Sequence, residues 1–104
     1  MHDLIIRNAT ICDGTGAAAR AGDIALSGGK IAALTAPGAI ASGSKNAVAQ
    51  IDAGGLVAAP GFIDVHTHYD AQLHWDPTAS PASWHGVTTL FTGNCGFTLA
   101  PARA

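Results

Sequence analysis

The segment His66-Thr67-His68 has the clearest capacity for chemistry in this sequence. It follows Phe62-Ile63-Asp64-Val65, a mostly apolar run. Because side chains alternate between the two faces of a strand, an extended chain here directs both imidazoles to one face and Thr67 to the other. Two imidazoles near the carboxyl end of a strand can share one metal ion. The same spacing is common among ordinary surface or packing histidines, so this pattern alone leaves both interpretations open.

Cys95 is a candidate for a third metal ligand. It lies in Gly93-Asn94-Cys95-Gly96, which begins two positions after the end of the β-branched run Val87–Phe91. If that run is a strand parallel to the first, both carboxyl ends lie at one edge and the thiol lies near the histidines. Cysteine together with histidine favours zinc over hard cations such as magnesium. The alternative is a small buried hydrophobic side chain, the usual role of a free cysteine.

The remaining polar residues are expected to have structural roles. The sequence contains no glutamate, so every carboxylate side chain belongs to an aspartate. Asp64 lies two residues before His66 and shares its face, which favours support or packing over proton transfer; Asp70 is expected to hold the following loop. Cys12 is expected to be a buried small side chain. A structural loop is favoured for His74, Trp75 and Asp76, with the mouth of a pocket as the alternative. His85 is expected to end a helix or pack against the loop, with contact to substrate as the alternative.

The elements that must position these residues begin at residue 60. Phe62–His66 and Val87–Phe91 are typical of strands in a sheet covered on both faces. Between them, Ser80-Pro81 favours the start of a short helix, and Gly86 favours its end. A strand, a crossover and a second strand are the opening of a parallel α/β unit.

Residues 1–59 are expected to form a separate unit of short strands divided by glycine turns. Gly28-Gly29 predicts a hairpin, because glycine readily adopts the positive φ of a type I′ turn. Asp13–Gly16 is a second predicted turn. The strands predicted in this part are Leu4–Ile6, Asp23–Ser27, Lys30–Leu34, Val48–Asp52 and Leu56–Ala59, with a loop over 36–46.

The composition excludes several classes of function. Among 104 residues, 12% are charged and the formal net charge is −2, so the chain lacks the basic surface typical of nucleic-acid binding. It also lacks an apolar run long enough for a membrane span. Two cysteines, far apart in the sequence, argue against a disulfide framework and favour a reducing cytoplasm.

The segment Ala59-Pro60-Gly61-Phe62-Ile63-Asp64-Val65-His66-Thr67-His68 resembles the first barrel strand of the amidohydrolase superfamily. Further motifs resemble its D-aminoacylase, or N-acyl-D-amino-acid deacylase, branch, and the resemblance covers essentially the whole chain. These motifs are Asp13-Gly14-Thr15-Gly16, Asp23-Ile24-Ala25-Leu26 to Lys30-Ile31-Ala32, Tyr69-Asp70-Ala71-Gln72, Trp75-Asp76-Pro77, His85-Gly86-Val87-Thr88-Thr89 and Gly93-Asn94-Cys95-Gly96-Phe97.

The resemblance implies an α/β fold in two parts. Residues 1–59 would be the N-terminal part of a small β-sandwich domain. Residues 60–104 would be the first strands of a TIM-like (β/α)8 metal-dependent hydrolase barrel, incomplete in this chain because such a barrel needs about 250 residues.

The same resemblance implies a zinc centre of one or two ions. His66 and His68 would be the metal ligands of the first strand, and Cys95 would replace the modified lysine of related hydrolases. Two further histidines and two aspartate roles, one as ligand and one as proton shuttle, would come from later strands. We therefore expect no catalytic acid or base within these residues, and substrate-binding residues stay unassigned.

The implied reaction is hydrolysis of an N-acyl-D-amino acid, a small-molecule substrate, to the D-amino acid and a carboxylate. We expect no nucleic-acid or membrane partner, and the oligomeric state stays open. The 104-residue chain by itself is expected to be inactive. Two alternatives remain open: a cyclic amidohydrolase related to dihydroorotases or hydantoinases, and a non-catalytic fragment with a metal-binding or structural role.

Overall fold

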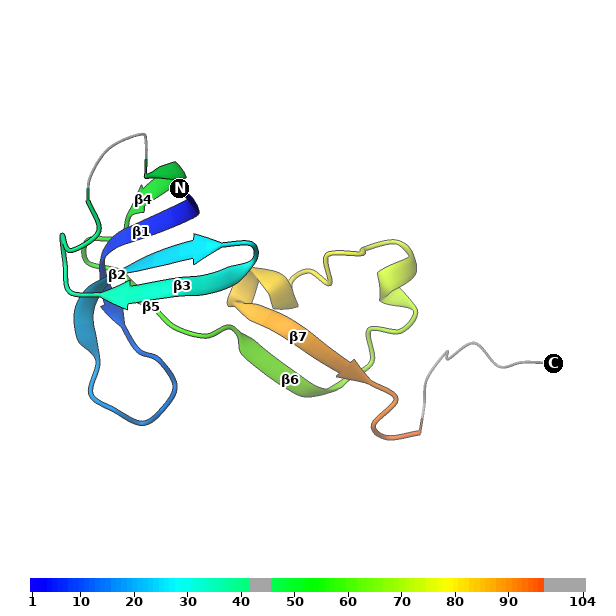
Figure 1. The fold of residues 1–104 in the computed structure, drawn as a ribbon. Coiled ribbons are helices and arrows are strands. Elements are labelled where there is room, and N and C mark those ends of the chain that lie inside the picture. The colour runs from blue at the N-terminus through cyan, green and yellow to red at the C-terminus, as the bar shows by residue number, and fades with distance from the viewer. Residues whose placement is uncertain (42–45, 97–104) are drawn as a thin grey trace. The chain divides into compact units, whose positions relative to one another are not determined.

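The computed structural model describes residues 1–41 and 46–96 (Figure 1). The chain divides into two compact units, Met1–Pro60 and Gly61–Ala104. Each unit is dominated by β-strands. Among the described helices, none has the length and apolar composition needed to cross a membrane.

The first unit contains one mixed sheet with the strand order β3-β2-β1-β4, and β5 also pairs with β1. The strand β1 is antiparallel to β2 but parallel to β4 and β5. With β2 on one side and β4 and β5 on the other, β1 lies inside the sheet and not at its edge, as Figure 1 shows. The strands are β1 (His2–Ile11), β2 (Arg20–Ser27), β3 (Lys30–Thr35), β4 (Ala47–Asp52) and β5 (Val57–Ala58).

The predicted glycine hairpin between β2 and β3 is confirmed. Gly28 and Gly29 have φ angles of 58° and 71°, and Ser27 pairs with Lys30 across the turn. Two consecutive positive φ angles are the signature of the type I′ turn, which glycine adopts without steric cost. The strands predicted at Leu4–Ile6, Val48–Asp52 and Leu56–Ala59 also form, with bounds that differ by a few residues.

Alternate residues of the central strands bury opposite faces of this sheet. Ile5 and Ala25 belong to one buried cluster, together with Ala47. Ile24 and Ile11 belong to a second cluster, on which Ile6 also packs. Since neighbours in the sequence fall into different clusters, the period of two typical of strands accounts for the core.

Asp23 is the buried charged residue of this sheet. Its carboxylate lies opposite an irregularity of β1, where the register shifts between Ile6 and Ala9 and Asn8 has a φ of 58°. The backbone N–H groups of Asn8 and Gly38 donate to Asp23, and the guanidinium of Arg7 forms an ion pair with it at 3.1 Å. A fully buried carboxylate is thus supplied with three donors, as burial of a charge requires.

The second unit contains β6 (Phe62–Thr67) and β7 (Val87–Thr92), which pair in parallel. The connection holds two 3-10 helices, η1 (Gln72–His74) and η2 (Ala82–His85). Gly86 ends η2 in a left-handed conformation with φ of 84°, as predicted from its position. The helix expected between Ser80-Pro81 and Gly86 is therefore the short 3-10 segment η2, and the chain has almost no helix among its described residues.

The faces of β6 differ from the prediction of a sheet covered on both sides. Phe62, Ile63 and Val65 are 68%, 61% and 60% exposed. A two-stranded sheet has only its crossover to cover it, so the apolar composition of β6 is not matched by burial among the described residues.

Candidate metal centre

The pairing of β6 with β7 brings the candidate ligands to one edge of the second unit. Parallel strands share their carboxyl ends, so the residues after Thr67 and after Thr92 leave the sheet on the same side. His68 follows β6 directly, and Cys95 lies three residues beyond β7. The predicted proximity of the two segments is confirmed.

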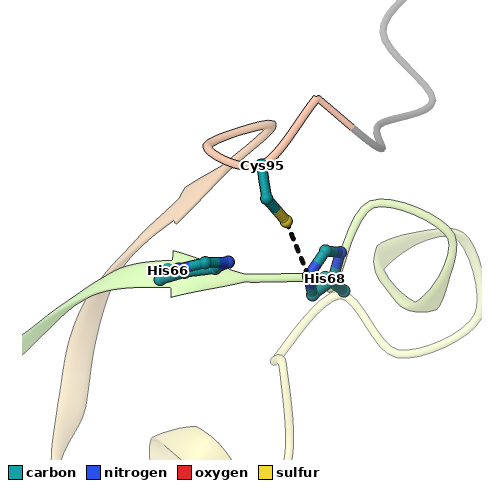
Figure 2. Close-up of side chains that lie close together, drawn as sticks. All are labelled: His66, His68 and Cys95. Atoms are coloured by element: carbon teal, nitrogen blue, oxygen red, sulfur yellow. Dashed lines mark hydrogen bonds between the residues drawn. The ribbon is translucent and has the colours of Figure 1, made fainter.

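His66, His68 and Cys95 form a compact cluster of ligand atoms. One atom from each residue can be chosen so that all three lie within 4.8 Å of one another. The imidazole rings lie 5.7 Å apart between centroids, tilted by 52°. The Cys95 Sγ atom lies 3.0 Å from Nε2 of His68, the contact drawn in Figure 2.

The alternation of side chains along β6 explains this orientation. Thr67 is only 5% exposed, whereas His66 and His68 are both exposed. This burial pattern agrees with the predicted opposition of the two imidazoles to Thr67. Their exposure leaves room for a metal ion and for groups from outside these residues.

An irregularity in the ladder lies directly at His66. Asp64 pairs with Leu90 and Thr67 pairs with Thr92, so two residues of β6 stand opposite the single residue Phe91. We call Val65-His66 the β6 bulge. Bulges locally change the direction of side chains and are common next to functional sites.

Three side chains bind backbone groups around the β6 bulge. The N–H of His66 donates to Asp64 Oδ1 at 3.2 Å, and the Thr67 hydroxyl donates to the carbonyl of Phe91 at 2.9 Å. Asn94 Nδ2 donates to the carbonyl of Val65 at 2.9 Å. Asp64 thus supports the backbone of His66, in keeping with the supporting role expected from the sequence. The role of Asn94 was not predicted, because it depends on the register of β7.

The loop that leaves His68 is organised by Asp76. Its carboxylate accepts hydrogen bonds from the Thr78 hydroxyl, the Ser80 N–H and hydroxyl, and Gln72 Nε2. Donation by Ser80, and then by Thr78 and Gln72, holds the pKa of the Asp76 carboxyl well below its usual range. Asp76 is therefore a structural loop residue, as expected; the spacing Asp-x-Thr-x-Ser is the sequence signal for its hydrogen-bonded turn.

The other candidates lie apart from this cluster or play structural parts. His74 and His85 are the last residues of η1 and η2, so His85 ends a helix as predicted. The prediction for Cys12 is wrong, because its side chain is exposed. Cys12 directly follows Ile11, the last residue of β1. It therefore lies outside the strand, where the alternation of buried and exposed side chains that buries Ile11 no longer applies.

The donor set fits zinc. Two imidazole nitrogens and one thiolate sulfur are borderline or soft ligands, which bind zinc in preference to magnesium or calcium. Three protein ligands are fewer than a closed four-coordinate site needs, so the cluster leaves positions for further ligands, water or substrate.

Comparison with known proteins gives consistent matches. The model of the Amidohydrolase family matches residues 49–103. An N-acyl-D-aspartate deacylase from Alcaligenes xylosoxydans xylosoxydans is 50% identical over 103 residues, which make up 95% of this chain and 19% of that protein.

Solved structures match the fold as well. A D-aminoacylase structure, determined in work on its binuclear metal centre, has a TM-score of 0.85 at 40% identity, covering 100% of this chain and 21% of its own. An N-acyl-D-glutamate deacylase from Bordetella bronchiseptica, complexed with zinc and a phosphonate inhibitor, has a TM-score of 0.85 at 39% identity, covering 99% and 21%. The chain thus spans about a fifth of the length of these relatives.

Proposed function

The chain belongs to the amidohydrolase family, in its D-aminoacylase branch, and from this premise we propose that it supplies part of the zinc centre of an N-acyl-D-amino-acid deacylase. The cluster of His66, His68 and Cys95 carries this proposal. The deacylase named above with bound zinc supports the choice of metal, and the work on a binuclear centre in D-aminoacylase supports one or two ions.

The proposed role of each residue follows from its position. His66 and His68 present imidazole nitrogens from the end of β6, and Cys95 presents its thiolate from the turn after β7. Zinc, when bound, supplies Lewis acidity that activates water and polarises the acyl carbonyl. The Asp64 carboxylate accepts a hydrogen bond from the N–H of His66 and so helps to orient this ligand.

We assign proton transfer to neither Asp64 nor Asp76 in the second unit. Asp64 is hydrogen bonded to the backbone of His66, and Asp76 holds the loop. Transfer of a proton to the leaving amine requires a carboxylate within reach of that nitrogen. We propose that this aspartate and the remaining metal ligands come from parts of the protein outside residues 1–104. Residues 1–104 by themselves would then give no turnover.

The architecture proposed for the whole protein is a β-sandwich with a (β/α)8 barrel. Residues 1–59 would contribute to the sandwich, and residues 60–104 would contain the first two barrel strands. The position of the candidate ligands supports this assignment, since active sites of such barrels lie at the carboxyl ends of the strands. A small-molecule N-acyl amino acid is the proposed substrate. The low cysteine content favours the cytoplasm as the compartment.

The two alternatives have less support. A hydantoinase- or dihydroorotase-like enzyme would act on a cyclic amide, whereas the relatives described above are named as deacylases of D-amino acids or D-aminoacylase. Cys95, in the place of a modified lysine, also favours the deacylase. A purely structural role for the cluster gives no reason for three metal-binding side chains to converge at an exposed edge.

An activity assay on the full natural protein that carries these residues tests the proposal. The substrates are the N-acetyl derivatives of D-aspartate, D-glutamate and an apolar D-amino acid, with their L enantiomers, hydantoin and dihydroorotate as controls. We expect zinc-dependent release of the free D-amino acid, abolished by a chelator and restored by zinc. Turnover of the cyclic amides alone would support the cyclic amidohydrolase, and no turnover by a zinc-loaded protein would support a non-catalytic role.

A further inference from the structure

Asn94 links the turn that carries Cys95 to the strand that carries His66. Its Nδ2 atom donates to the carbonyl oxygen of Val65 at 2.9 Å, across 29 residues of sequence. Val65 belongs to the β6 bulge and directly precedes His66. One hydrogen bond therefore joins the two strand ends from which the candidate ligands project.

The turn itself is defined by its glycines. Gly93 and Gly96 have φ angles of 80° and 76°, and the N–H of Gly96 donates to the carbonyl of Gly93 at 3.1 Å. Positive φ at both ends is a conformation that glycine adopts at little cost. The internal geometry of the turn is thus set by the glycines, but the direction of Cys95 also depends on how the turn is attached to β6.

Asn94 provides that attachment next to the β6 bulge. A bulge disrupts the regular ladder, and side chains can bind backbone groups there in place of the neighbouring strand. The carboxamide of Asn94 does so at Val65, and Cys95, its neighbour, then contacts His68. Since Asn94 is exposed, its hydrogen bond contributes to the placement of the turn more than to burial of a core.

We propose that Asn94 is a positioning residue of the metal centre, which holds Cys95 against His68 before the metal binds. The inference rests on the proposed function, because it takes His66, His68 and Cys95 as zinc ligands. A ligand already held in place loses less conformational freedom on coordination, so the metal binds more tightly. Groups that orient metal ligands typically change metal affinity by about 10–100-fold when removed.

Cobalt substitution of the full natural protein tests this role without relying on activity. The variants are Asn94→Ala, which removes the carboxamide, and Asn94→Asp, which keeps the shape but offers oxygen atoms that do not donate to a carbonyl. Asn46→Ala is the matched control, since Asn46 Nδ2 donates to the carbonyl of Ala41 at 3.0 Å in the first unit. The readouts are the thiolate-to-cobalt charge-transfer absorption, the zinc affinity by competition with a chelator, and the thermal unfolding of each variant.

We expect the wild type and Asn46→Ala to show the thiolate absorption. Both Asn94 variants should bind zinc about 10–100-fold more weakly and show a reduced thiolate absorption at limiting cobalt. Wild-type affinity and absorption in both Asn94 variants would overturn the inference and leave the proposed function intact. Loss of the folded state in both would also overturn it, because Asn94 would then hold the sheet and not the site. A wild type without thiolate absorption would overturn the proposed function as well.

Discussion

The sulfur of Cys95 lies 3.0 Å from Nε2 of His68, although 27 residues separate them in the sequence. Both residues stand just beyond the carboxyl ends of paired parallel strands, β6 and β7. Side-chain hydrogen bonds from Asn94 and Thr67 reinforce the same edge. Strand pairing and side-chain hydrogen bonds of the protein itself therefore bring the candidate ligands together.

Removal of the Asp23 charge should destabilise the first unit strongly. Asp23 is fully buried, and Asp23→Asn breaks its ion pair with Arg7 and leaves that guanidinium without its carboxylate. Breaking a buried pair costs about 3–5 kcal/mol of unfolding free energy. Urea unfolding of the full natural protein measures this loss. Asp3→Asn is the control, because Asp3 is exposed and accepts a hydrogen bond from the turn N–H of Gly28. Equal losses of unfolding free energy in the two variants would contradict the expectation.

The stabilisation by Asp23 should disappear in acid. Burial raises the pKa of the Asp23 carboxyl, but hydrogen bonds from the N–H groups of Asn8 and Gly38 and the charge of Arg7 outweigh burial, so the pKa is lowered. A group with a lowered folded-state pKa stabilises the fold above its ordinary pKa of about 4, and this contribution is lost as the pH falls through the folded-state value. The difference in unfolding free energy between the wild type and Asp23→Asn should therefore narrow below about pH 4. A difference that stays constant or widens in acid would contradict this sign.

Loss of the Asp76 carboxylate should release the loop after His68. Asp76→Ala removes the acceptor for the Ser80 N–H and for the side chains of Thr78 and Gln72. Hydrogen exchange followed by mass spectrometry should then show faster exchange over residues 72–80. Asp52→Ala, which removes the acceptor for the Gly54 N–H in the first unit, should leave this loop unchanged. Unaltered protection of the loop in Asp76→Ala would show that the loop is held by other contacts.

Gly61 should not tolerate a side chain. A Cβ atom at Gly61 would lie 2.7 Å from Cβ of Thr88, the extra residue of β7 between the pairs Phe62–Val87 and Ile63–Thr89. Real Cβ atoms do not approach so closely, so Gly61→Ala should lower the unfolding free energy by about 1–3 kcal/mol.

The matched control for Gly61 is Gly54→Ala. A Cβ atom there would lie 3.4 Å from the nearest atom, Asp52 Oδ1, a flexible side-chain contact that can adjust. Thermal unfolding of the two variants compares them directly. A loss for Gly54→Ala as large as for Gly61→Ala would contradict the steric explanation.

Strand alternation and the shared direction of parallel strands predicted that His66, His68 and Cys95 would lie together. The period of two along a strand placed His66 and His68 together and opposite Thr67, and the shared direction of parallel strands brought Cys95 beside them. The type I′ hairpin at Gly28-Gly29 was equally predictable, because it depends on the conformational freedom of two adjacent glycines.

Features that depend on the exact register between distant segments were not predictable. The β6 bulge and the role of Asn94 follow from the register of β6 against β7, and a single sequence does not contain that register. The same reason applies to Cys12, whose exposure depends on where β1 ends relative to its neighbours. The crossover was expected to contain a helix that starts at Ser80-Pro81. The N–H and hydroxyl of Ser80 instead donate to the Asp76 carboxylate, and only the short 3-10 segments η1 and η2 form.

X-ray absorption at the zinc edge of the full natural protein tests the metal centre most directly. We expect one sulfur at about 2.3 Å and nitrogen at about 2.0–2.1 Å from the zinc. Cys95→Ser should remove the sulfur scatterer, whereas Cys12→Ser, which changes the other exposed cysteine, should leave it in place. A zinc environment without sulfur in the wild type, or one whose sulfur survives Cys95→Ser, would contradict the assignment of Cys95 as a zinc ligand.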